Sequence, residues 1–128
     1  MKMIAHTRIV GSVTIVDVYG RIVLGEGSDG LRDLIRNLIQ GGNKKILLNL
    51  RDVDYIDSSG LGELVKALTS MRSKGGELKL LNLTKRVRAL LQITKLSTVF
   101  DVADDEAISV NSFSPAIWPS SLPDPVMG

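Results

Sequence analysis

The hydrophobic and polar positions near the N-terminus follow the alternating pattern of β-strands. Residues 4–10 and 13–20 are rich in β-branched side chains, and Gly11-Ser12 separates them. Two such runs joined by a short turn predict a β-hairpin. Residues 22–24 extend the apolar pattern, and a glycine-rich corner at residues 25–27 ends it.

Beyond this corner, apolar residues recur three and four positions apart, which indicates amphipathic helices. We expect the first helix to begin at Ser28, whose hydroxyl can serve as the N-cap, and to end at Gly41-Gly42. A second helix is expected to end at Gly75-Gly76, and Thr84 is expected to cap a third. The apolar stripes of the three helices are Leu31, Leu34, Ile35, Leu38 and Ile39, then Leu61, Leu64, Val65, Leu68 and Met71, then Val87, Leu90 and Leu91.

Short apolar runs lie between the helices. Residues 46–50 are nearly all apolar, which favours a strand that is covered on both faces, as in a parallel sheet. Residues 51–57 are expected to be a connection. Residues 78–83 and 99–102 predict two further strands.

The order of the elements predicts an α/β fold. Asp104 or Asp105 is expected to start a final helical turn, which brings the helices to about four. Helices and strands that alternate after a hairpin give a mixed, mostly parallel β-sheet with an N-terminal hairpin strand. Binding sites in such sheets lie beyond the carboxyl ends of the strands, and residues 57–60 follow a strand in that way.

Composition divides the chain into a domain and a tail. We expect residues 1–111 to form one domain, because 128 residues suit a single core. All four prolines lie in residues 112–128, which are expected to be a Pro-rich C-terminal tail without regular helix. Two alternatives remain for this tail: a mobile segment, or a segment that docks through Ile117 and Trp118 on its own surface or on a neighbouring chain.

Charge and composition exclude several functions. Sixteen basic and fourteen acidic residues give a net charge of +2, which is too small to indicate nucleic-acid binding. The chain has no cysteine and a single histidine, His6, so we expect no metal site and no cofactor. No apolar run is long enough for a membrane span, and no signal peptide is present, so a cytoplasmic protein is expected.

The sequence does not favour an enzyme. Asp52-Val53-Asp54 follows a strand, as the nucleophile of an aspartyl phosphotransferase would, but Tyr55-Ile56 replaces the threonine or valine pattern expected after it. Neither a Gly-x-Ser-x-Gly elbow nor a Walker loop occurs. We therefore expect no catalytic residues.

The segment Asp57-Ser58-Ser59-Gly60-Leu61-Gly62 is the strongest candidate for a functional site. It lies at the start of a helix, where unpaired N–H groups and the helix dipole favour an anion such as a phosphoryl group. Gly60 and Gly62 leave the backbone of the first turn open, although each glycine weakens the helix. The residues alone leave two interpretations equal: serine capping of the helix, or a phosphorylated switch at Ser58.

Residues 53–62 resemble the phosphorylation-site segment of the anti-sigma-factor antagonists, which are STAS domains. The strand at residues 47–50, the segment 75–80 and the third helix with its exit at Val99-Phe100 are similar as well, so that the resemblance covers about residues 4–110. It implies the STAS fold and a binding module rather than an enzyme. It also implies that Ser58 is the phosphorylated residue and that Ser59 is not the acceptor.

The resemblance implies specific partners. The unphosphorylated form binds an anti-sigma factor that is also a serine kinase of the GHKL type, and a sigma factor is thereby freed. A PP2C-type phosphatase removes the phosphate from Ser58, and a weak homodimer is an open alternative. Partner-binding residues are expected at Asp57, Ser58, Ser59, Gly60, Leu61, Gly62 and Glu26.

One departure from the family pattern concerns the partner surface. Well-studied members often have an acidic residue directly after the glycine that closes the second strand, but here Arg21 follows Gly20 and the acidic residue, Glu26, comes later. An alternative function is therefore a STAS scaffold in a signalling complex without regulated phosphorylation. Basic residues on the third helix are expected either to be solvated or to attract an acidic partner: Lys85, Arg86, Arg88 and Lys95.

Overall fold

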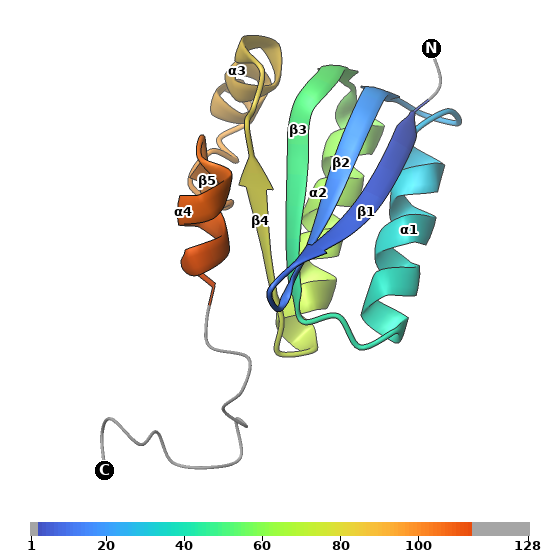
Figure 1. Cartoon of the computed structure of the whole chain (residues 1–128). Coiled ribbons are helices and arrows are strands. Elements are labelled where there is room, and N and C mark those ends of the chain that lie inside the picture. Colours follow the sequence, from blue (N-terminus) through green and yellow to red (C-terminus); the bar gives the residue numbers. More distant parts are fainter. Residues whose placement is uncertain (1–2, 114–128) are drawn as a thin grey trace.

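The strands form one five-stranded sheet, with helices on both of its faces (Figure 1). The computed structural model describes residues 3–113. The elements in chain order are β1 (Ile4–Val10), β2 (Val13–Ile22), α1 (Ser28–Gln40), β3 (Lys45–Ile56), α2 (Ser58–Ser73), β4 (Glu77–Leu81), α3 (Lys85–Ile93), β5 (Val102–Ala103) and α4 (Glu106–Asn111).

The order of the strands in the sheet is the same as their order in the chain. β1 pairs antiparallel with β2, as the predicted hairpin requires, and every later pairing is parallel. The mixed, mostly parallel sheet with an N-terminal hairpin strand is therefore confirmed, as is the prediction of about four helices, since residues 3–113 contain four.

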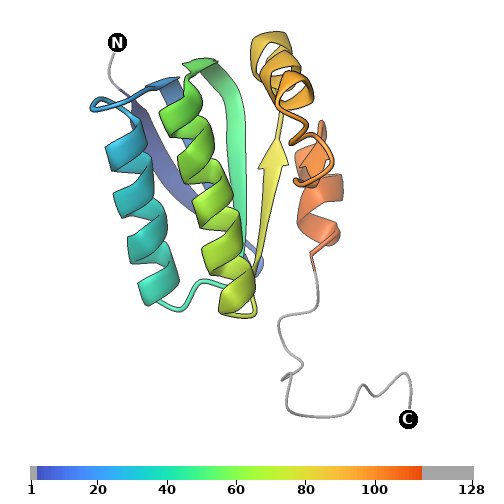
Figure 2. The same cartoon turned by 180° about the vertical axis from the view of Figure 1, so that it is seen from behind.

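Two apolar layers hold the helices against the sheet. α1 and α2 lie side by side on one face (Figure 2), where they bury the larger core with residues such as Leu31, Leu64 and Leu48. On the opposite face, α4 and the residues after it cover a smaller cluster, in which Phe113 packs against Ile15 and other residues. Ile46, Leu47 and Leu48 are fully buried, as expected for a strand that is covered on both faces.

The structure corrects the predicted end of the third strand. Residues 51–56 are not a connection, because β3 continues to Ile56 and pairs with β2 as far as Ile22. The exposed, charged residues in this half of β3 obscure its strand pattern in the sequence. Parallel pairing with the long strand β2 outweighs their weak intrinsic preference for strands.

Two further local predictions are wrong. The last strand is Val102–Ala103 rather than residues 99–102, because Val99 belongs to a turn in which its N–H donates to Leu96 O. Ser28 does not cap α1, since it is the first helical residue, and Gly27 occupies the N-cap position without a side-chain bond. A Cβ at Gly27 would lie 2.2 Å from Arg21 O, which explains why this cap position has no side chain.

Other predicted boundaries are confirmed. Thr84 caps α3 through its Oγ1, which accepts from Val87 N at 3.2 Å, and Asp105 caps α4. Within residues 3–113, no helix is long and apolar enough to cross a membrane. Phe113 lies just beyond the expected domain boundary and is buried on the sheet, whereas Ile117 and Trp118, the expected docking residues of the tail, lie outside the described residues.

Candidate functional site

The candidate site lies where the carboxyl ends of β2 and β3 meet. The pair Ile22 and Ile56 is the last register position of these two strands. The loop from β2 to α1 and the start of α2 therefore leave the sheet side by side, and the N–H of Asp57 donates to Ile22 O at 3.2 Å. Parallel pairing thus brings together two segments that are more than thirty residues apart in the chain.

Asp57 is the N-cap of α2 and joins these two segments. Its Oδ1 accepts a hydrogen bond from Gly60 N at 2.9 Å, and its Oδ2 accepts one from Leu24 N at 3.0 Å. The hydrogen bond from Gly60 N has the largest effect on this carboxyl, followed by the bond from Leu24 N. Both stabilise the charged form and lower the pKa of the Asp57 carboxyl below its usual value. A carboxylate also interacts favourably with the positive end of the helix dipole.

Because Asp57 is the N-cap of α2, Ser58 has no capping role. Neither serine caps α2, contrary to the first of the two interpretations of this segment. Among the described residues, the Ser58 hydroxyl has no hydrogen-bond partner, and its side chain is exposed, whereas Ser59 is half-buried. Ser58 is therefore the more accessible hydroxyl at the start of α2.

Gly60 and Gly62 have different roles. A Cβ at Gly60 would lie 2.3 Å from Ile22 O, so that this glycine allows the first turn of α2 to pack closely on the end of β2. Its N–H is bonded to Asp57 and is not open to a ligand, which corrects the sequence-based interpretation of this residue. A Cβ at Gly62 would meet no atom within 4 Å.

A groove of about 480 Å³ opens beside Ser58, between the start of α2 and α3. Ser58 and Arg86 both line it, and Arg86 has no ion-pair partner within residues 3–113. By contrast, Arg88 on the same helix pairs with Asp104 at 3.2 Å. The full lining is Tyr55, Ile56, Asp57, Ser58, Arg86, Val87, Ala89, Leu90 and Ile93.

Large apolar side chains are exposed around this groove. Ile93, on α3, is 79% exposed, and Leu24, in the loop tied to Asp57, is 74% exposed. The guanidinium of Arg21 lies 5.2 Å from the centre of the Tyr55 ring, a cation–π contact next to the groove. Exposed apolar residues beside a polar hydroxyl are typical of a protein-binding surface.

The structure brings most of the predicted site residues together. Asp57, Ser58, Ser59 and Gly60 form the start of α2, and Leu61 is buried beneath it. Glu26 is exposed in the same loop as Leu24. The sequence does not single out Leu24 and Ile93 as contact candidates, because single exposed apolar residues resemble core residues in the sequence.

Residues 52–54, which the sequence already disfavours as an aspartyl phosphotransferase motif, lie within a strand. Asp52 and Asp54 lie within β3 rather than beyond its end, so they do not occupy the position of a phosphotransferase nucleophile. In residues 3–113, no three histidine, aspartate or glutamate side chains are placed to hold a metal ion.

Comparison with known proteins finds one family model and several named relatives that match this chain. Residues 5–108 match the family model of the STAS domain. The anti-sigma-B factor antagonist of Bacillus subtilis (strain 168) is 38% identical over 88 residues, which are 69% of this chain and 73% of that protein.

Solved structures are similar in fold. A putative anti-sigma factor antagonist from Thermotoga maritima has a TM-score of 0.75 at 25% identity, covering 85% of this chain and 93% of that one. The Bacillus cell fate determinant SpoIIAA in its phosphorylated form has a TM-score of 0.67 at 19% identity, covering 84% and 97%. The latter likeness concerns the fold alone.

The contrast between Gly60 and Gly62 gives a first prediction. Gly60→Ala should lower the free energy of unfolding by about 2 kcal/mol, because the added methyl group overlaps Ile22 O. Gly62→Ala, the matched control in the same turn, should be neutral or stabilise by up to about 1 kcal/mol, since alanine favours a helix. Urea unfolding of both variants measures the difference, and equal effects would contradict this assignment.

The lowered pKa of Asp57 gives a second prediction. A carboxyl with a depressed folded-state pKa stabilises the protein above its unfolded pKa, about 4, and this contribution is lost as the pH falls further. In Asp57→Asn the group no longer titrates and the bond from Leu24 N is lost. The melting-temperature difference between wild type and Asp57→Asn should therefore be constant from about pH 5 to 7 and shrink below about pH 4.

A control variant is measured over the same pH range. Asp54→Asn removes another exposed carboxylate, three residues away, that accepts no hydrogen bond in the described structure. A melting-temperature difference between wild type and Asp57→Asn that stays constant down to about pH 2 would contradict the prediction. It would show that the Asp57 carboxylate does not stabilise the loop before α1 and the start of α2.

Proposed function

Since this chain belongs to the STAS domain family, we propose that it is an anti-sigma-factor antagonist whose binding is switched by phosphorylation of Ser58. The observation that carries the proposal is the division of roles at the start of α2. Asp57 caps the helix, and the exposed Ser58 hydroxyl has no partner among the described residues. A modification of this hydroxyl therefore leaves the hydrogen bonds that maintain the fold intact.

The unphosphorylated surface suits a protein partner. Leu24 and Ile93 are exposed apolar residues near Ser58, and their burial against a partner provides hydrophobic stabilisation. The relative from Bacillus subtilis is named for antagonism of an anti-sigma factor. We infer that the partner is an anti-sigma factor that is also a serine kinase of the GHKL type, and that its binding here frees a sigma factor.

In the kinase reaction, Ser58 is a substrate rather than a catalyst. Its hydroxyl oxygen attacks the γ-phosphorus of ATP, the bond to the β-phosphate oxygen breaks, ADP leaves, and the hydroxyl proton passes to a base of the kinase. The product carries about two negative charges at pH 7. These charges must be desolvated if the same apolar partner surface is to bind again, which weakens the complex.

Arg86 is the one basic residue that lines the groove together with Ser58. We infer that the phosphorylated side chain pairs with Arg86 and occupies part of the groove. Such a pair covers the surface on which the partner binds. A PP2C-type phosphatase restores the free hydroxyl, and Glu26, exposed in the loop joined to Asp57, contributes to the contact with the kinase.

A second candidate is a STAS scaffold in a signalling complex without regulated phosphorylation. Arg21 favours it, because this cation lies on the Tyr55 ring at the position where related antagonists often have an acidic residue. In that case the same surface binds a partner whether or not Ser58 carries charge. No catalytic activity is proposed for either form.

The leading proposal predicts a specific response at Ser58. With the anti-sigma kinase of its own cell and ATP, phosphate should appear on Ser58, as mapped by mass spectrometry, and not in Ser58→Ala. Ser58→Asp should weaken binding of the kinase by at least about tenfold, or 1.4 kcal/mol, in calorimetry. Ser58→Ala should keep the affinity of the wild type within about threefold, because the loss of one exposed hydroxyl is a small change.

Ser59→Ala is the control for position. It should still incorporate phosphate, since the acceptor hydroxyl remains. Equal affinity of wild type and Ser58→Asp for the native partner would favour the scaffold and overturn the switch.

The pairing of Arg86 is tested without any kinase. Phosphoserine is installed at position 58 by genetic encoding, and the second pKa of its phosphate is followed by ³¹P NMR. Arg86→Gln should raise this pKa, because loss of a neighbouring cation disfavours the dianion. Lys85→Gln, which removes an exposed cation from the same turn of α3 outside the groove, should change it much less. Equal shifts in the two variants would exclude a direct pair.

A further inference from the structure

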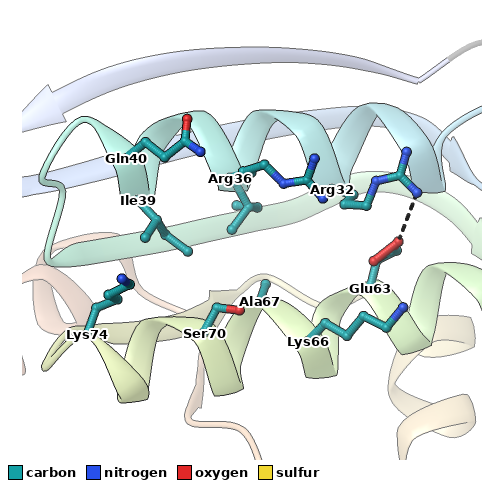
Figure 3. A pocket seen from close by; sticks show the side chains of 10 residues that line it. Arg32, Arg36, Ile39, Gln40, Glu63, Lys66, Ala67, Ser70 and Lys74 are labelled. Atoms are coloured by element: carbon teal, nitrogen blue, oxygen red, sulfur yellow. Dashed lines mark ion pairs between the residues drawn. The ribbon is translucent and has the colours of Figure 1, made fainter.

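A second groove, separate from Ser58, lies between α1 and α2. Its volume is about 410 Å³, and it runs along the two neighbouring helices from Arg32 and Glu63 at one end to Gln40 and Lys74 at the other (Figure 3). Ile35, Ile39 and Ala67 form an apolar floor. The groove lies on the face of the sheet that α1 and α2 cover, and none of its lining residues lines the groove beside Ser58.

Positive charge dominates most of this groove. Arg36, Lys66 and Lys74 line it, and none of them has an ion-pair partner within residues 3–113. Arg32 differs, because Asp29 and Asp33 lie within 3.5 Å of its guanidinium. The unbalanced positive charge is therefore concentrated away from Arg32, and it complements an acidic partner.

Glu63 adds a different requirement at the end of the groove near Arg32. Its side chain is only 9% exposed, and its Oε2 lies 4.0 Å from Arg32 Nη1. Its Oε1 is buried and accepts no hydrogen bond. A buried acceptor without a donor is unfavourable. Because Glu63 lines the groove, an occupant that carries an N–H into this end can donate to its carboxylate.

These features together select one class of occupant. We propose that the α1–α2 groove binds an acidic, amphipathic segment of a partner protein. Acidic side chains pair with Arg36, Lys66 and Lys74, aliphatic side chains cover Ile35 and Ile39, and a backbone N–H donates to Glu63. An inorganic anion has no aliphatic group to cover Ile35 and Ile39, and a flat anionic membrane does not reach a recessed carboxylate.

The chemistry is tested with a defined probe on the intact chain. The probe is a synthetic twelve-residue peptide of alternating Leu-Glu pairs with blocked ends, and the control peptide has glutamine in place of every glutamate. In ¹⁵N–¹H NMR titrations at physiological salt, the acidic peptide should shift the amide signals of Ile39, Ala67 and Ser70, which line the groove. The glutamine peptide should bind at least about tenfold more weakly.

Charge-reversal variants inside and outside the groove test whether the acidic peptide binds in the groove. Arg36→Glu and Lys66→Glu should each weaken the acidic peptide by about tenfold or more, whereas Lys85→Glu, the same change of charge on α3, should stay within about twofold. All three residues are exposed, so that folding is not at risk. Equal weakening in the three variants, or shifts spread evenly over the surface, would mean attraction by net charge alone and would overturn the proposal.

Two further experiments distinguish a protein segment from a small anion and from a lipid surface as the ligand of the groove. Inorganic phosphate that shifts the same signals at lower concentration than the peptide would assign the groove to a small anion and overturn the proposal. Vesicles of phosphatidylcholine with phosphatidylglycerol that sediment wild type but not Lys66→Glu would assign it to a lipid surface, with the same consequence. Because these measurements do not involve Ser58, their failure leaves the proposed phosphorylation switch untouched.

Discussion

The geometry of the candidate site depends on the carboxylate of Asp57. This side chain accepts hydrogen bonds from Gly60 N in the first turn of α2 and from Leu24 N in the loop before α1. The two donors belong to segments that only the sheet brings together. Because the cap is a carboxylate with two acceptor oxygens, it holds both segments at once, which a serine hydroxyl at the same position does not do as well. The neighbouring Ser58 is thereby left without a structural role.

The close approach at Gly60 makes this arrangement stiff. The first turn of α2 rests on the end of β2, with too little space for a side chain between them. Further along α2, Leu64, Leu68 and Met71 are buried in the larger core. The Ser58 hydroxyl therefore lies on a helix that is held both at its start and along its apolar face.

The sequence predicts the features that depend on local pattern. The hairpin strand 4–10, the cap at Thr84 and the doubly covered run at residues 46–48 all follow from periodicity and from side-chain chemistry. Prediction from the sequence fails where contacts between distant segments determine the secondary structure. The second half of β3 is polar in sequence but pairs with β2, and Val99-Phe100 packs as a turn although it is apolar.

The candidate site shows the same division. The segment that begins at Asp57 is found from its composition, but aspartate and serine are both good N-caps, so the sequence does not reveal which one has the extended backbone of the cap. Arg86 and Ile93 join Ser58 only through the packing of α3 against β3. No local signal links residues so far apart, and the roles of the predicted partner-binding residues stay predictions.

A rigid site favours a switch that works through surface chemistry. A phosphoryl group on Ser58 would lie at the positive end of the α2 dipole, which favours its negative charge and offsets part of the repulsion from the Asp57 carboxylate. From Ser58 to Ser70 in the α1–α2 groove is about 18 Å along the helix, at 1.5 Å per residue. This exceeds the screening length of about 8 Å at physiological ionic strength, so the far end of the groove scarcely senses the new charge, whereas Glu63 lies only about 7.5 Å along the helix from Ser58. One helix can therefore present a surface that phosphorylation alters and a second surface whose far end it leaves unchanged.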